Sequence, residues 1–184
     1  KDPLDLRLHL TKGHERMHAL LTTLRQVSGW DEPMGPQRGR GVASRIYSVS
    51  PIANTVEVTV SDDGQYTVDR IVCVIDCGFA VNPLGIESQI HGGIMLGLNA
   101  AAMGAIDIEE GRVLQSNFHD YVPLRFHQMP NVEVHIMPSD APSTGVGEQA
   151  STAIGPALAN AIFDATGQRV RQFPLSRQGF TLKV

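Results

Sequence analysis

The sequence has few cysteines, no surplus of positive charge and no long hydrophobic run. Its 184 residues include two cysteines, which cannot hold an iron–sulfur cluster unaided because such clusters usually take four thiolates. Fifteen basic and nineteen acidic residues give a formal net charge of -4, which provides no basic footprint for nucleic acid. The most apolar run, residues 94–106, is too short and too rich in glycine and alanine to cross a bilayer. With 42% hydrophobic residues, the chain can still bury a sizeable core.

The two cysteines are not expected to form a disulfide. Cys73 and Cys77 fall in a predicted strand, where residues four apart are separated by about 13 Å, beyond the reach of a disulfide. We expect two small buried side chains on one face of the strand.

The N-terminal part has the apolar spacing of two helices within residues 1–28, interrupted at Gly13. Residues 31–41 are rich in glycine and proline and indicate a connection. We therefore divide the chain into a helical segment with its linker, residues 1–41, and a second domain, residues 42–184. The chain begins at Lys1 and not at methionine, which suggests part of a longer polypeptide and leaves its compartment without a prediction.

A zinc-binding pattern lies in the first segment, where His14-Glu15-Arg16-Met17-His18 matches H-E-x-x-H. The extended form of that pattern needs a glycine and a third histidine, but Leu21 and Leu24 occupy those places. A solvated helix with two ordinary histidines is the favoured interpretation, and a zinc hydrolase is the weaker alternative.

From Val42 the periodicity changes to that of strands. Valines alternate with polar residues over 56–60, Asp62-Asp63-Gly64 marks a turn, and residues 71–75 form a buried apolar run, which together predict a β-hairpin. The later patterns predict a helix over 83–103, a second hairpin over 106–114, a strand over 132–136 and a loop over 138–143. Helices at both ends, with hairpins and a helix between them, predict an α+β fold.

A glycine-rich turn, Thr144-Gly145-Val146-Gly147-Glu148, precedes an alanine-rich helix that ends near Gly167. Glycines let the backbone approach a bound group, and the free N–H groups of a helix N-terminus favour anions. Pro156 is expected in the first turn of this helix. The turn could therefore be a ligand cradle with a carboxylate base beside it, or simply a loop with a surface carboxylate.

The helix over 83–103 contains four glycines, each of which weakens a helix by up to about 1 kcal/mol. Two interpretations stay open: tight packing against another helix, or a bound cofactor lying against Gln89 and the Gly92-Gly93 pair. A third candidate, the neighbouring His119 and Asp120, is not expected to form a catalytic dyad, since adjacent strand residues point to opposite faces.

Taken together, these stretches resemble a known family. The segments that carry the resemblance occur in one order and are Asp76-Cys77-Gly78, Val81-Asn82-Pro83, Gln89-Ile90-His91-Gly92-Gly93, Gln115–Tyr121 and the turn ending in Glu148. They resemble the molybdenum-binding large subunit of the xanthine oxidase superfamily, especially the beta subunit of isoquinoline 1-oxidoreductase and related bacterial aldehyde dehydrogenases. The resemblance extends roughly from Asp2 to Pro174.

The resemblance implies an oxidoreductase that oxidises an aldehyde or hydroxylates an N-heteroaromatic compound, with the oxygen taken from water. It implies that Glu148 is the general base and that Gln89 hydrogen-bonds the molybdenum site. It also places glycines and a valine beside the cofactor: Gly92, Gly93, Gly145, Val146 and Gly147. The molybdenum is held by the pterin, with no ligand directly from the protein.

The resemblance also implies partners, because the chain is too short to be a whole large subunit. The remainder of that subunit would complete the molybdopterin site, and a small two-cluster iron–sulfur subunit would receive the electrons. The isoquinoline type implies the cytosine dinucleotide form of the pterin. Relatives commonly carry prolines soon after the glutamate, whereas Gln149-Ala150-Ser151-Thr152 follows here, so a non-catalytic partner subunit is the alternative.

Overall fold

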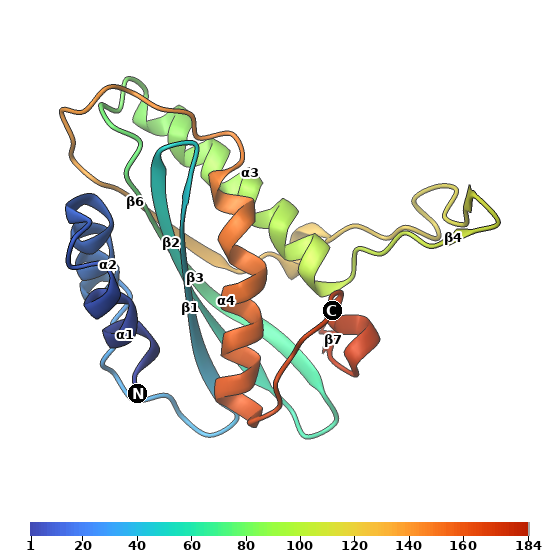
Figure 1. Cartoon of the computed structure of the whole chain (residues 1–184). Coiled ribbons are helices and arrows are strands. Elements are labelled where there is room, and N and C mark those ends of the chain that lie inside the picture. The colour runs from blue at the N-terminus through green and yellow to red at the C-terminus, as the bar shows by residue number, and fades with distance from the viewer. Residues whose placement is uncertain (184) are drawn as a thin grey trace.

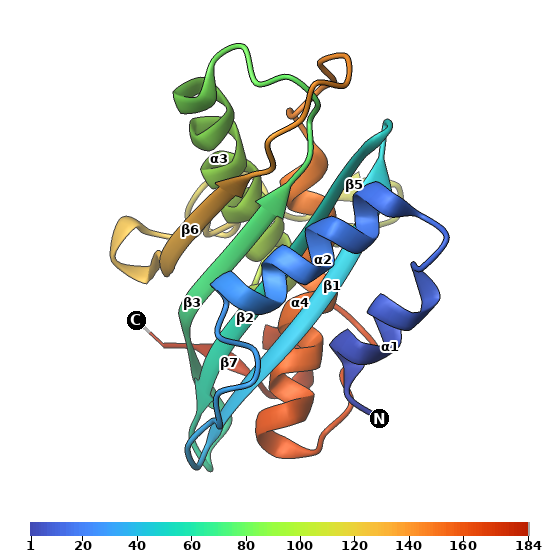
Figure 2. The same ribbon diagram turned by 90° about the vertical axis from the view of Figure 1, so that its left-hand side faces the viewer.

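The computed structural model describes residues 1–183 and shows one mixed β-sheet between two helical layers (Figures 1 and 2). The strand order is β1-β2-β3-β6, and β7 pairs with the first residues of β3. The elements are α1 (Pro3–Leu10), α2 (Glu15–Val27), β1 (Arg38–Tyr47), β2 (Ser50–Val60), β3 (Gln65–Ile75), α3 (Pro83–Ala102), β4 (Ile108–Glu109), β5 (Arg112–Val113), η1 (Phe126–Gln128), β6 (Asn131–Ile136), α4 (Gln149–Thr166), η2 (Leu175–Gln178) and β7 (Thr181–Leu182).

Two apolar cores hold these layers together, one on each face of the sheet. Alternate residues of β2, such as Ile52 and Val56, pack under α3 and α4. Their neighbour Ala53 faces the other way and joins a smaller core beneath α1 and α2. The antiparallel pairs β1–β2 and β2–β3, combined with the parallel pair β3–β6, confirm the α+β class.

Most of the predicted elements are confirmed, including the two N-terminal helices, the β2–β3 hairpin, α3 and β6. The second hairpin is also present, as the short pair β4–β5 in the arm between α3 and η1 (residues 103–125), which projects from the body (Figure 1). One expectation within α4 is wrong: the helix begins at Gln149, so Pro156 lies in its interior and not in its first turn. Proline has no N–H, so it cannot make the helical bond to the fourth residue before it.

Strand β1 was missed by the sequence patterns, and it starts at Arg38, inside the stretch expected to be a linker. A Cβ at Gly39 or Gly41 would overlap backbone atoms of α4, because that helix lies directly on the strand. The strand therefore has glycines at positions where a typical strand has large side chains, so its sequence lacks the alternating pattern that predicts a strand. The division of the chain at residue 41 stays a prediction.

The helical layer of residues 1–41 is tied to the sheet by a buried arginine. Arg40 bonds Glu57 on the neighbouring strand, Nε to Oε1 at 3.0 Å, and donates to the carbonyl groups of Gly29 and Trp30 just after α2. Both charged side chains are almost fully buried, and each is paired as buried charges must be. Among the described residues, no helix is both long and apolar enough to cross a membrane.

The two cysteines are free thiols, as expected, and both are buried in the larger core. Cys73 lies within β3, whereas Cys77 follows the end of that strand. Burial raises the pKa of both thiols. They act as small apolar side chains.

The two histidines of the H-E-x-x-H pattern have ordinary hydrogen-bond partners. His14 is the N-cap of α2, with Nδ1 accepting from the Met17 N–H at 3.3 Å, and so lies before the helix and not on its first turn. His18 Nδ1 lies 3.1 Å from the carbonyl oxygen of Leu8. Within residues 1–183 there is no group of three histidine, cysteine or acidic residues that could hold a metal ion. The zinc hydrolase alternative therefore has no geometric support.

An ion pair fixes α2 to the end of β3. Arg16 grips the Asp76 carboxylate with two bonds, Nε to Oδ2 at 2.6 Å and Nη2 to Oδ1 at 2.7 Å. Asp76 also accepts from the Gly78 N–H at 3.0 Å. The Arg16 guanidinium, helped by this backbone bond, outweighs the burial and holds the pKa of Asp76 below its usual value.

Replacing Asp76 by asparagine is expected to lower the free energy of unfolding at neutral pH by about 1–2 kcal/mol. The figure is discounted because the Arg16 side chain is 37% exposed. A carboxyl pKa that is lower in the folded state adds stability above the unfolded value of about 4 and loses it as the pH falls through the folded value. Urea unfolding should therefore show a smaller difference in the free energy of unfolding between the wild type and Asp76→Asn at pH 3 than at pH 7. Asp140→Asn, an exposed change nearby, is the control, and an equal gap at both pH values would refute the assignment.

Candidate functional site

The residues expected at the site gather at one end of the molecule, where the β1–β2 turn and the N-terminal ends of α3 and α4 meet (Figure 1). Glu148 is the N-cap of α4. Gln89 lies on α3, and a Cβ built at Gly147 would stand 4.0 Å from Gln89 Nε2. The fold therefore brings together Gln89 and the glycine-rich turn, which are far apart in sequence.

The glycine-rich turn is held from one side by the segment that follows β3. The Thr144 N–H donates to the Cys77 carbonyl at 2.8 Å, and the Phe79 N–H donates to the Ala141 carbonyl at 2.8 Å. Gly78 has φ 73°, and a Cβ there would overlap the Pro142 carbonyl. This packing gives the Asp-Cys-Gly sequence its structural reason: a left-handed residue without a side chain lets the two loops touch.

The turn is held from the other side by the β1–β2 hairpin. The buried Ser50 hydroxyl donates to the Gly145 carbonyl at 3.0 Å and lies 2.6 Å from the Thr144 hydroxyl. The buried Gln149 side chain accepts from the Glu148 N–H at 3.1 Å and donates to the Tyr47 carbonyl at 3.5 Å. Sequence reasoning missed Ser50 and Gln149 because their partners are mostly backbone groups.

The Glu148 carboxylate has a specific partner that the sequence did not suggest. Tyr47, the last residue of β1, donates its hydroxyl to Glu148 Oε2 at 2.7 Å. This bond to the carboxylate, more than any other cause, raises the pKa of Tyr47. The Arg45 guanidinium carbon lies 4.9 Å from the centre of the Tyr47 ring. Glu148 is exposed, and its side chain makes no capping bond to α4.

The site glycines divide into two groups. A Cβ at Gly93 would lie 2.9 Å from Ala150 Cβ, and one at Gly97 would lie 2.6 Å from the Ser151 carbonyl oxygen, so these two let α3 and α4 pack closely. A Cβ at Gly92 would meet no described atom within 4 Å. For Gly145 and Gly147 the nearest atoms are side-chain nitrogens at 3.8 and 4.0 Å.

None of the three open glycines (Gly92, Gly145, Gly147) has a left-handed φ that would require glycine. The described residues thus supply neither a packing nor a turn reason for them. Bare backbone at this surface fits a flat group that lies against it. Val146 differs, because its side chain packs against the main core.

Large apolar side chains are exposed around the same end of the molecule. Val81 and Leu84, just before and within the start of α3, are 76% and 79% exposed. Val49 at the hairpin turn and Phe79 after β3 are also mostly exposed. Exposed large apolar side chains at one end of a molecule are typical of a surface that another protein segment covers.

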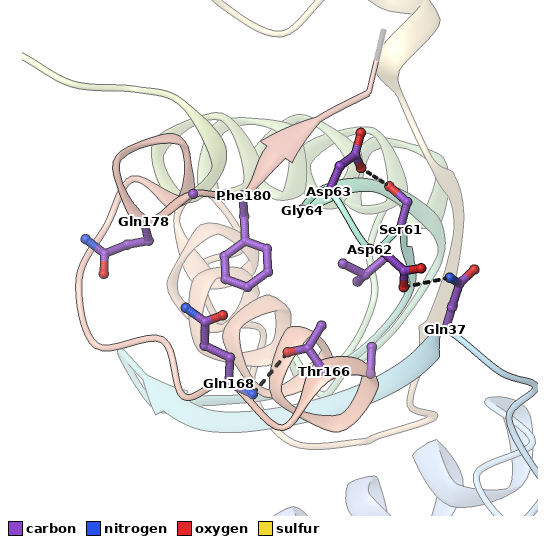
Figure 3. A pocket seen from close by; sticks show the side chains of 12 residues that line it. Gln37, Ser61, Asp62, Asp63, Gly64, Thr166, Gln168, Gln178 and Phe180 are labelled. Carbon is purple, nitrogen blue, oxygen red and sulfur yellow. Dashed lines mark hydrogen bonds between the residues drawn. The ribbon is translucent and has the colours of Figure 1, made fainter.

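A hollow of about 600 Å³ lies elsewhere, at the opposite end of α4 (Figure 3). It is lined by polar groups that include Asp62, bonded by Gln37, and Asp63, bonded by Ser61. An 18-residue helix is about 27 Å long, so this hollow is far from Glu148. None of the predicted site residues lines it.

The neighbours His119 and Asp120 lie in a turn of the arm, so the strand expected there was wrong. Their side chains approach each other, with His119 Nε2 and Asp120 Oδ2 3.5 Å apart. Asp120 accepts from the backbone N–H groups of Asn117 and Ser116, each at 2.9 Å, and these bonds lower its pKa to about 2. Asp120 therefore has a structural role, because it fixes the backbone of this turn.

Comparison with known proteins agrees with this geometry. Residues 15–130 match the family model described as the molybdopterin cofactor-binding domain. The chain is 33% identical to the beta subunit of the isoquinoline 1-oxidoreductase of Brevundimonas diminuta, a match that covers 95% of this chain and 23% of that protein. It is 32% identical to a subunit of the nicotinate dehydrogenase of Pseudomonas putida, over 96% of this chain and 16% of that one.

Among solved structures, the aldehyde oxidoreductase of Desulfovibrio desulfuricans superposes with a TM-score of 0.60 at 30% identity, covering 68% of this chain and 14% of that chain. The chain thus spans about a quarter or less of the length of the relatives it matches. The sequence similarity to the first two relatives extends over nearly the whole chain, and the chain belongs to the xanthine oxidase family of molybdenum-binding large subunits.

Proposed function

We propose that this chain is the C-terminal part of a molybdenum hydroxylase that oxidises an aldehyde or hydroxylates an N-heteroaromatic compound with oxygen from water. The observation that carries the proposal is the set of three open glycines, Gly92, Gly145 and Gly147, around Gln89 and Glu148. The relatives named above act on N-heteroaromatic compounds and aldehydes, as their names state.

Each predicted site residue has a role in this proposal. Gln89 and the open glycines (Gly92, Gly145, Gly147) line the surface against which the molybdopterin lies. Gly93 and Val146 bring the helix and the turn close, from the core side. When bound, the molybdenum cofactor supplies the redox chemistry. Glu148 would accept the proton of the attacking water-derived oxygen, since its carboxylate is exposed and makes no capping bond to the helix.

The remaining parts of the enzyme are proposed to be the rest of the large subunit and a small two-cluster iron–sulfur subunit. The projecting arm supports the first of these, because its exposed large apolar side chains would be buried by a covering segment. Its exposed apolar side chains are Ile106, Ile108, Val113, Leu114, Phe118 and Val122. The cytosine dinucleotide form of the pterin is proposed from the similarity to the isoquinoline 1-oxidoreductase.

A non-catalytic role was suggested by the absence of prolines after Glu148. Gln149 replaces their stiffening effect, because its buried amide is bonded both to the Glu148 N–H and to the Tyr47 carbonyl. These hydrogen bonds hold the loop where relatives have prolines, which supports the catalytic proposal over the non-catalytic one.

Elemental analysis of the assembled complex tests the proposal. We expect molybdenum near one atom per large subunit, together with dye reduction by an aldehyde or an N-heteroaromatic compound. The matched control is the same complex produced without molybdate, which should be inactive. A pterin-free complex that reduces no dye with either substrate class would favour a non-catalytic role, and stoichiometric zinc in place of molybdenum would revive the His14–His18 alternative.

A further inference from the structure

We infer that Tyr47 is a positioning residue for Glu148. From its place in the β1–β2 hairpin, the Tyr47 hydroxyl holds the Glu148 carboxylate in the position needed for proton transfer. This inference rests on the proposed function, in which Glu148 is the general base. Tyr47 itself is not expected to contact the substrate or the cofactor.

The bond between the two side chains is short and charge-assisted. Tyr47 Oη lies 2.7 Å from Glu148 Oε2. A neutral hydroxyl that donates to a carboxylate makes a stronger bond than one between two neutral groups. No other side chain within residues 1–183 bonds the Glu148 carboxylate, so this contact defines its direction.

Tyr47 can position the Glu148 carboxylate because Tyr47 is itself held by its neighbours. It ends β1, its carbonyl accepts from the buried Gln149 amide, and its ring lies beside the Arg45 guanidinium. The next two residues, Ser48 and Val49, form a tight turn with φ of 45° and 66°. A β-branched valine rarely adopts such a φ, and strained residues of this kind persist where the surrounding structure holds them.

The β1–β2 hairpin and the glycine-rich turn are also joined by further side-chain bonds. Ser50, directly after the tight turn, bonds the Gly145 carbonyl and the Thr144 hydroxyl. The hairpin is therefore joined to the turn through Ser50, through Gln149 and through Tyr47, and the contact through Tyr47 is the one that ends on a reacting group. Small errors in the placement of a base can reduce rates by about 100-fold.

The test compares Tyr47→Phe with Tyr66→Phe in the assembled enzyme. The Tyr66 hydroxyl is buried and has no hydrogen-bond partner among the described residues, so this control removes an identical group without breaking a bond. For Tyr47→Phe we expect kcat per bound molybdenum to fall about 10- to 100-fold with an unchanged KM. Tyr66→Phe should match the wild type.

A second measurement does not depend on activity. The phenolate absorbance of the assembled protein is titrated in the wild type, in Tyr47→Phe and in Glu148→Gln. The transition missing from Tyr47→Phe identifies Tyr47, and it should move to lower pH in Glu148→Gln because the neighbouring negative charge is gone.

The outcomes separate the two claims. If Glu148→Gln is inactive while Tyr47→Phe keeps the wild-type kcat, the positioning role is wrong and the proposed function stands. An unmoved Tyr47 transition in Glu148→Gln would also overturn the contact. A wild-type complex without molybdenum or turnover would instead refute the proposed function, whatever the titration shows.

Discussion

Glu148→Gln is expected to lower the turnover of the assembled enzyme by about 10²- to 10⁴-fold, the range typical of losing a general base. Glutamine has nearly the shape of glutamate and can still accept the Tyr47 hydroxyl, so the turn should keep its structure. What it loses is the ability to take a proton at working pH. Molybdenum content should therefore stay at the wild-type level while dye reduction per bound molybdenum collapses.

The matched control for this substitution is Glu15→Gln. Glu15 is the acidic residue of the H-E-x-x-H pattern and lies exposed in the first turn of α2. Under the proposed function its replacement should leave turnover unchanged, whereas a zinc hydrolase would lose its base. Near-normal turnover of Glu148→Gln would remove Glu148 from the base role.

The regular elements were predictable where periodicity reflects burial on one face. The alternating valines of β2 and the apolar spacing of α2 are of this kind. Strand β1 was not predictable, because Gly39 and Gly41 lie under α4 and provide close packing in place of an alternating pattern. The interior position of Pro156 in α4 was not predictable either, because proline is ordinarily accepted in the first turn of a helix.

The candidate site was predictable in part. The glycine-rich turn and Gln89 were found through the family resemblance, and the fold brings them together. Tyr47 was not found, because it is 101 residues from Glu148 and nothing in its local sequence indicates that contact. Gln149 was missed for a different reason: its side chain bonds backbone groups, and a backbone partner leaves no trace in the sequence.

Gly147→Ala should separate the two explanations for the site glycines. Its Cβ would meet no described atom closer than 4.0 Å, so the free energy of unfolding should be unchanged or slightly higher, since alanine restricts the unfolded chain. If a cofactor lies against this backbone, the added methyl group overlaps it, at a penalty of about 1–3 kcal/mol. The rate of molybdenum loss on dilution should then rise about 10- to 100-fold.

Two other glycine-to-alanine substitutions serve as controls for Gly147→Ala. Gly13→Ala adds a methyl group between α1 and α2 that would meet no described atom within 4 Å, and it should affect neither stability nor molybdenum retention. Gly97→Ala places its Cβ 2.6 Å from the Ser151 carbonyl oxygen and should destabilise the fold. If Gly147→Ala behaves like Gly97→Ala, the need for glycine arises within the chain; if it behaves like Gly13→Ala in both measurements, no group approaches the turn. Loss of molybdenum with a stable fold is the pattern that a cofactor-binding surface requires.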